Sequence, residues 1–266
     1  MTGDPPTPRR IGRVNWLGVW TLYVKEVRRF LNVLTQAVFA PVITALLFLA
    51  IFTLALERAV EVAPGVPYAR FLAPGIVMTV IVQNAFSNTS SSLLVSKIQG
   101  NIVDMLMPPL SAHELTVGYA LAGMTRGLLV AVVAVLAMSV FVHFEVHDPG
   151  AILFFAASAS LLLALLGLMT GIWADKFDHI AAITNFVVMP LAFLSGSFYS
   201  IERLPGVWNT LARFNPFFYM IDGFRYGFIG HADGSLAIGV ATMLALNFTL
   251  WMVCQRMLAS GYKLKP

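Results

Sequence analysis

Long apolar stretches separated by short polar ones dominate the sequence. A helix needs roughly 20 apolar residues to cross the hydrocarbon core of a bilayer. The pattern therefore predicts an all-α integral membrane protein with six transmembrane helices. We expect them at about Ala37–Leu56, Phe71–Val95, within Thr116–Val142, and at about Ala151–Ala174, Ile180–Phe198 and Leu236–Val253.

The segment before the first span follows a different pattern. Between residues 15 and 34, polar residues such as Thr21, Lys25 and Arg28 recur at helical spacing, while Trp16 and Trp20 fall on another face. This segregation predicts an amphipathic helix lying in the membrane surface. The alternative is a juxtamembrane extension of the first span. We divide the remaining chain into a mobile basic tail (1–14), a six-span domain (35–258) and a cytoplasmic basic tail (259–266).

Polar residues also interrupt the second span and follow it. The second half of that span, residues 83–92, is rich in Asn, Ser and Thr, which favours contacts with other helices over a path-lining role. Residues 97–115 are too polar to span. There Gly100–Asn101 suits a turn or cap, Pro108–Pro109 ends a short helix, and Ile102, Val103, Leu106 and Met107 offer an apolar face.

An aromatic stretch, FNPFFYMIDGFRYGF, precedes the last span. Asn is a favoured N-cap and Pro suits the first helical position, so Asn215 and Pro216 predict a helix from Pro216 to about Ile229. Tyr219 and Asp222 form part of a narrow polar stripe, and Arg225 is three residues from Asp222, close enough to pair. Residues 201–214 predict a second short helix. The alternative is an aromatic belt at the membrane interface with a surface ion pair.

Composition and charge support a membrane location. The chain is 58% hydrophobic and 11% charged, whereas soluble domains carry about 25% charged residues. Lys and Arg are more numerous on the side of the N-terminus, which predicts that both termini are cytoplasmic. Cys254 is the only cysteine, which excludes an intrachain disulfide. The first long apolar run begins near Ala37, so we expect no signal peptide.

The sequence lacks the motifs of the common enzyme classes. It has no GxxxxGK[ST], GxSxG or HExxH, and no acidic residue lies within the predicted spans, which counts against an ion-driven carrier. His143 and His147 lie in a short loop that we expect to be a polar exterior loop and not a metal site. We expect no catalytic residue, metal or nucleic-acid partner. An ion-driven transporter or channel and a lipid-modifying membrane enzyme remain alternatives.

Several blocks together resemble a known family. The N-terminal amphipathic helix, the six spans, GNIVDMLMPPLSAHEL after the second span and PLAFLSGSFYSIERLP with FNPFFYMIDGFRYGF before the last are similar to the ABC-2 type permeases, in particular small bacterial inner-membrane permeases of the YadH type. The resemblance begins near Trp16. It implies a permease dimer, with a second and identical copy, that exports an amphiphilic cargo through the inner membrane. Two copies of a separate ATPase would bind ATP and Mg, so the permease itself is not an enzyme.

The resemblance also assigns roles to residues. It implies a cytoplasmic coupling helix seated in the ATPase, an interface helix that also touches the ATPase, and a re-entrant helical hairpin between the fifth and sixth spans that roofs the exit. For the coupling helix, the alternative is a cytoplasmic turn without a partner. The residues concerned are Gly100, Asn101, Asp104, Leu106, Pro108, Pro109 and Glu114 for coupling; Lys25, Glu26 and Arg28 for the interface helix; and Asn215, Pro216, Tyr219, Asp222 and Arg225 for the outer helix.

Overall fold

The computed structural model describes residues 12–56 and 67–264, and over these ranges the chain is helical with no strand. Most of the predicted N-terminal tail and the last two residues lie outside the described residues. The elements are α1 (Trp16–Leu31), η1 (Thr35–Phe39), α2 (Ala40–Leu56), α3 (Tyr68–Ile98), α4 (Ile102–Leu106), α5 (Ala112–Met138), α6 (Pro149–Trp173), α7 (Phe177–Ile183), η2 (Thr184–Val188), α8 (Met189–Leu194), η3 (Ile201–Arg203), α9 (Gly206–Phe214), α10 (Pro216–Ile229) and α11 (Leu236–Ser260).

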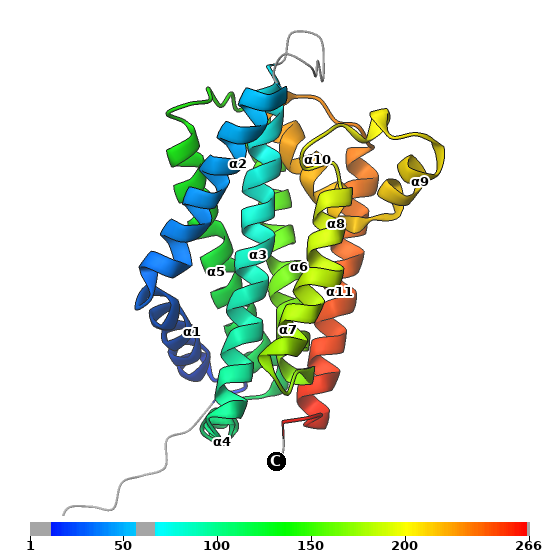
Figure 1. The fold of residues 1–266 in the computed structure, drawn as a ribbon. Helices are drawn as coiled ribbons and strands as arrows, with labels where there is room; N and C mark the ends of the chain where they lie inside the picture. Colours follow the sequence, from blue (N-terminus) through cyan, green and yellow to red (C-terminus); the bar gives the residue numbers. More distant parts are fainter. Residues whose placement is uncertain (1–11, 57–66, 265–266) are drawn as a thin grey trace, which may run out of the picture.

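Six helical segments of the described chain are long and apolar enough to cross a membrane, which confirms the predicted number. They stand side by side, with α1 and α4 at one end of the bundle and α9 and α10 toward the other (Figure 1). The second segment, Tyr68–Ile98, is longer than predicted at both ends. The last continues to Ser260 because the chain leaves the helix only at Gly261, which has a φ of +67°.

The predicted N-terminal helix is present and ends at Leu31. One face, carrying Val19, Leu22 and Phe30, is buried against the bundle, while Trp16 and Trp20 are exposed. Only residues 32–34 separate this helix from η1, which continues directly into α2. The chain therefore turns from α1 into the first span without a long connecting loop.

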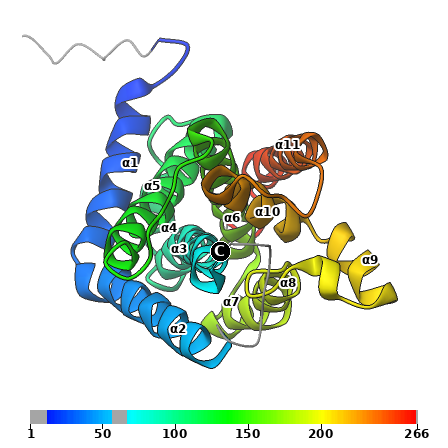
Figure 2. The ribbon, with the colours of Figure 1, turned by 90° about the horizontal axis from the view of Figure 1, so that it is seen from above.

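The third helix, α3, is the centre of the bundle. Seen from above, α2, α5, α6 and the α7–α8 segment surround it (Figure 2). Its polar half is shielded: Asn84, Asn88, Thr89 and Ser90 are all buried. The Thr89 hydroxyl donates to the Ala164 carbonyl of α6 at 2.8 Å. The structure confirms that these residues make contacts between helices.

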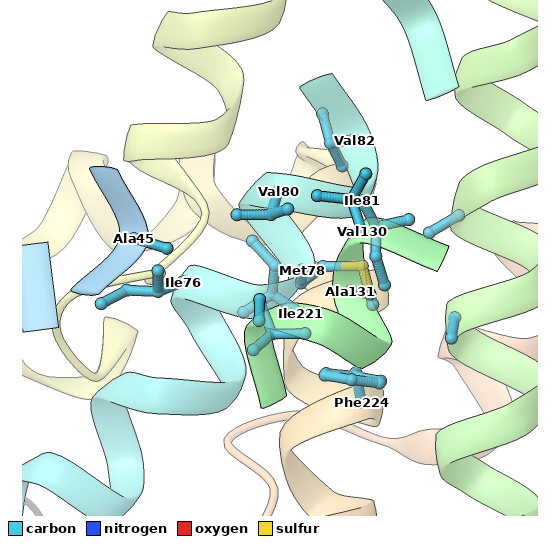
Figure 3. Close-up of a cluster of buried hydrophobic side chains, with 14 of the residues drawn as sticks. Ala45, Ile76, Met78, Val80, Ile81, Val82, Val130, Ala131, Ile221 and Phe224 are labelled. Atoms are coloured by element: carbon cyan, nitrogen blue, oxygen red, sulfur yellow. The ribbon is translucent and has the colours of Figure 1, made fainter. Parts of the chain in front are cut away.

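The apolar part of α3 anchors the core. Met78 and Ile81 pack against Val130 of α5, and Ile221 and Phe224 of α10 complete the same cluster (Figure 3). In a bilayer these side chains would otherwise contact lipid tails, so van der Waals packing holds the helices together here, without fixing their register. The register comes from closer contacts between backbones.

Gly167 and Gly171 of α6 provide such contacts with α3. A Cβ at Gly167 would lie 2.3 Å from Thr89 Oγ1 and 2.4 Å from the Phe86 carbonyl oxygen. A Cβ at Gly171 would lie 2.9 Å from the Ser90 carbonyl oxygen. The GxxxG spacing therefore marks a true close approach of two helices, as small residues do in membrane bundles.

Gly167→Ala should destabilise the bundle by about 1–3 kcal/mol, because the added methyl group has no room against the α3 backbone. The measurement is thermal unfolding of the purified protein in detergent. Gly239→Ala in α11 is the matched control, since its nearest neighbour would be 3.4 Å away, an ordinary contact. Equal unfolding temperatures for the two variants would contradict the role of Gly167.

Candidate functional site

The beginning of α1 is joined to the beginning of α5 by one carboxylate. Glu114 closes a capping box at the start of α5: its side chain accepts from the Ser111 backbone N–H at 2.7 Å, and the Ser111 hydroxyl accepts from the Glu114 N–H. The same carboxylate accepts the backbone N–H of Asn15, the N-cap of α1. Glu114, which the resemblance places among the coupling residues, thus satisfies backbone donors of two helix starts.

Asn15 extends this connection to the segment after α4. Its side-chain amide donates to the Pro109 carbonyl at 3.3 Å, while its side-chain oxygen accepts the Gly18 N–H at 3.0 Å. A Cβ at Gly18 would lie 2.6 Å from Leu110 Cδ2. The Gly18 backbone therefore packs directly on the Leu110 side chain, and together with the Asn15 hydrogen bond this contact joins α1 to residues 108–110.

The short helix α4 presents two different faces. Ile102 and Met105 are buried in a cluster with Leu115 and Tyr119 of α5. Val103, Leu106 and Met107 are exposed, Met107 to 76%. The sequence placed Ile102 on the exposed apolar face, which is wrong, because Ile102 packs inward. The turn before α4 uses Gly100 at a φ of +75°, and the Asn101 side chain makes no cap hydrogen bond.

A groove of about 410 Å³ runs between α1 and α4. Lys25 lines it from α1, and Asp104 and Pro108 line it from the α4 side. The groove brings together two predicted sets of residues that are about 80 positions apart in sequence. We call this surface, together with the exposed face of α4, the α1–α4 surface.

The three polar residues predicted as contacts of α1 point in different directions. Lys25 and Arg28 are exposed, but Glu26 is only 1% exposed. Glu26 pairs with Arg29 at 3.0 Å, and Arg29 donates to the backbone carbonyl of Asn88 at 2.7 Å. Glu26 therefore belongs to a polar connection between α1 and the middle of α3, and Lys25 and Arg28 remain on the free face.

Charged residues also fasten the ends of α3, α6 and α11 at this side of the bundle. Lys97 donates to the carbonyls of Ile172 and Ala174 at 2.9 and 2.6 Å. Lys263 donates to the carboxylate of Asp175 at 2.7 Å. That hydrogen bond and the positive charges around it hold the pKa of Asp175 below its usual range.

At the opposite end, the predicted start of α10 is confirmed. Asn215 caps the helix by accepting the Phe217 N–H at 3.0 Å, and Pro216 is the first helical residue. The Asn215 amide also donates to the Leu191 carbonyl of α8 at 2.6 Å. The short helix expected before it is present as α9. Two short helices thus lie between the fifth and sixth spanning segments.

The predicted ion pair between Asp222 and Arg225 is wrong. No salt bridge joins them in the part of the chain that the structure describes, and both side chains are buried, which also excludes a surface pair. Asp222 instead accepts the backbone N–H groups of Asp233 and Gly234 at 2.8 and 2.9 Å. Arg225 donates to the Gly196 carbonyl at 2.6 Å and stacks over Phe71, 3.6 Å from the ring centroid.

Sequence reasoning missed the partners of these two charges. Asp233, for which we predicted no role, accepts from the Ser200 hydroxyl at 2.7 Å and the Ile201 N–H at 3.1 Å. Asp222 and Asp233 therefore join α10, the loop before η3 and the loop before α11. Tyr219, another residue of the predicted stripe, is half-buried beside Phe218. The signal that could have found the loop is the Asp233–Gly234 pair, a common turn sequence.

The loop with the two histidines packs on α10. The His147 ring lies edge-on to Tyr226 with ring centroids 5.4 Å apart, and Glu145 pairs with Arg70 at 2.8 Å. Among the described residues, no group of three His, Cys, Asp or Glu side chains could hold a metal ion. The loop therefore serves as a cover over the end of α10.

Comparison with known proteins supplies a family. A family model described as ABC-2 type transporter matches residues 18–229. The chain is 33% identical over 250 residues to the inner membrane transport permease YadH of Escherichia coli (strain K12), covering 94% of this chain and 98% of that protein. It is 28% identical over 245 residues to Nodulation protein J of Rhizobium leguminosarum bv. trifolii, covering 87% of both chains.

Exchanging the two buried charges, Asp222→Arg with Arg225→Asp, should not rescue the single variants. Each charge interacts with backbone groups fixed elsewhere, and an uncompensated buried charge costs roughly 3–5 kcal/mol. Thermal unfolding of the two single variants and the double variant tests this.

The control for the exchange is the exposed pair Arg70–Glu145, at the same end of the bundle. Its exchange should be nearly neutral, because exposed pairs contribute about 0–1 kcal/mol. Wild-type stability of the Asp222–Arg225 double variant would contradict this prediction and indicate that the two side chains pair directly.

Proposed function

This chain belongs to the ABC-2 type transporter family, and we propose that it is the permease subunit of an ATP-driven exporter. It would form the translocation path as a dimer of identical copies in a bacterial inner membrane. A separate ATPase subunit, present in two copies, would bind ATP and Mg. The relative named as an inner membrane transport permease supports the location. The dimer and the ATPase are taken from the family resemblance.

The observation that carries the proposal is the α1–α4 surface. An exposed apolar tip of Val103, Leu106 and Met107 is costly in water and typical of a surface that another protein covers. The tip adjoins a groove with Asp104 and Lys25, which can provide polar contacts around an apolar centre. We propose that the ATPase docks here, with α4 as the coupling helix and α1 as the interface helix.

The contacts behind this surface give a route for movement. When the ATPase closes around ATP, it would push α4, which rests on α5 through Met105 and Tyr119. Because Asn15 and Glu114 join α1 to the same region, α1 would move with it. Displacement of α1 would reach α3 through Arg29 and Asn88, and the first span through η1.

The opposite end would form the exit. We propose that α9 and α10 make a re-entrant hairpin that roofs the path, held in place by Asn215 and Asp222. Its aromatic rings suit an amphiphilic cargo such as a lipid, glycolipid, polysaccharide or drug, because Phe and Tyr rings offer apolar contact area and the tyrosine hydroxyls can form hydrogen bonds. Opening would require this roof to separate from α3.

Both termini should be cytoplasmic, as the distribution of Lys and Arg predicts. A reporter enzyme that is active only outside the cytoplasm, fused after Val146, should be active, and the same reporter fused after Met107 should be inactive. The segment between α5 and α6, which carries Val146, and the end of α4, which precedes Met107, lie at opposite ends of the bundle (Figure 1). Reporter activity after Met107 and none after Val146 would show the opposite topology. The proposed docking surface would then lie outside the cytoplasm, where it could not bind the ATPase.

Met107→Glu and Asp104→Arg should each reduce recovery of the ATPase by about tenfold or more, since removing one interface anchor typically costs ~1.4 kcal/mol or more. The measurement is affinity purification of the tagged permease from its native membranes, with mass spectrometry of co-purified proteins that carry a phosphate-binding loop.

The matched control is Val146→Glu, also a change from an exposed apolar residue to an acid but at the other end. It should retain the ATPase. If the α4 variants and the control co-purify with equal amounts of ATPase and transport cargo equally well, α4 is a cytoplasmic turn without a partner. If no ATPase is recovered with the wild-type chain and flux in liposomes proceeds without one, the permease would be ion-driven.

A further inference from the structure

A second groove lies between α6, α7 and α11. The end of α6, the start of α7 and the end of α11 lie at the end of the bundle that carries α4 (Figure 1). Its volume is about 610 Å³, within the usual range of small-molecule sites. Leu166, Met169 and Ile183 provide apolar walls. Trp173, Met169 and Leu166 follow one another at spacings of four and three residues, so they mark one face of α6 over roughly 10 Å.

The groove changes from apolar to polar toward the ends of its helices. Arg256 and Ser260 line it from the last turns of α11, and Tyr262 lines it from the segment that follows. Arg256 is exposed and has no hydrogen-bond or ion-pair partner among residues 12–56 and 67–264. Lys263, by contrast, is held on Asp175. The free charge at this mouth therefore belongs to Arg256.

Trp173 indicates how deep in the membrane the polar mouth of the groove lies. It ends α6 and is 40% exposed beside the groove. Tryptophan is enriched where the hydrocarbon core meets the headgroups, and arginine near a helix end extends toward the same level. The polar mouth and the apolar wall thus match the two parts of a membrane lipid, a headgroup and an acyl chain.

We propose that this groove binds an anionic phospholipid of the membrane. Its phosphate would accept hydrogen bonds from the Arg256 guanidinium and from the hydroxyls of Ser260 and Tyr262. One acyl chain would lie along Leu166, Met169 and Ile183. Charge complementarity favours this occupant over a second copy of the chain, because burying an unpartnered Arg256 in a protein interface would be costly. The site lies apart from the α1–α4 surface and does not depend on an ATPase.

The test uses the purified full-length chain without any partner. Native mass spectrometry and thermal unfolding compare phosphatidylglycerol with phosphatidylcholine of the same acyl chains. Phosphatidylglycerol should remain bound and raise the unfolding temperature more than phosphatidylcholine. Arg256→Gln should weaken its retention about tenfold, because it removes a charge-assisted hydrogen bond. Short-chain phosphatidylglycerol should not replace it, since the apolar wall would stay empty.

The matched control is Arg13→Gln, which removes an exposed positive charge near the start of α1. It should retain phosphatidylglycerol like the wild type. Met169→Trp, which fills the groove, should release the lipid while leaving Arg256 in place. Equal retention of the two lipids, or equal loss with Arg256→Gln and Arg13→Gln, would overturn the proposal. Cross-linking of two chains through Ser260→Cys in native membranes would show that a second copy covers the groove instead.

Discussion

The polar half of α3 has to be kept away from lipid, and the rest of the bundle is arranged around this constraint. An unpartnered hydroxyl or amide in hydrocarbon is costly, so Thr89 and Asn88 require helices close on every side. Gly167 allows α6 to come close enough for Thr89 to donate to its backbone. Arg29 of α1 then reaches Asn88 from another side. Close packing of α6 and α1 on α3 thus supplies hydrogen-bond partners for the Thr89 hydroxyl and for the two carbonyl oxygens of Asn88.

Local signals in the sequence predicted most of the helices and the start of α10. The six spans follow from apolar length, and α10 begins at Pro216 as its Asn-Pro pair predicted, because capping involves only neighbouring residues. The GxxxG spacing of Gly167 and Gly171 is a further local feature, and it coincides with a close helix contact. Spacing within one helix was not sufficient for Asp222 and Arg225, whose partners are backbone groups from other segments.

The difference between local signals and contacts between distant segments also applies to the candidate docking surface. Its two halves could be found separately, since α1 is amphipathic and α4 is a short helix ended by prolines. The side that each residue faces depends on tertiary packing: Glu26 and Ile102 lie inward, although their neighbours Lys25 and Val103 lie outward. The hydrogen bond from Asn15 to Glu114 spans 99 positions and has no local signal. The sequence therefore indicated where the surface lies, and the structure showed which residues are exposed on it.

The short connection between α1 and the first span has a mechanical consequence. Residues 32–34 leave no slack, and the π-helical turn at Thr35–Phe39 carries the helix directly into α2. Because no long loop separates the two helices, a swing of α1 in the plane of the membrane would be passed to α2 as a rotation about its own axis. Inserting flexible residues between α1 and η1 would uncouple the movements of α1 and α2 without altering either helix.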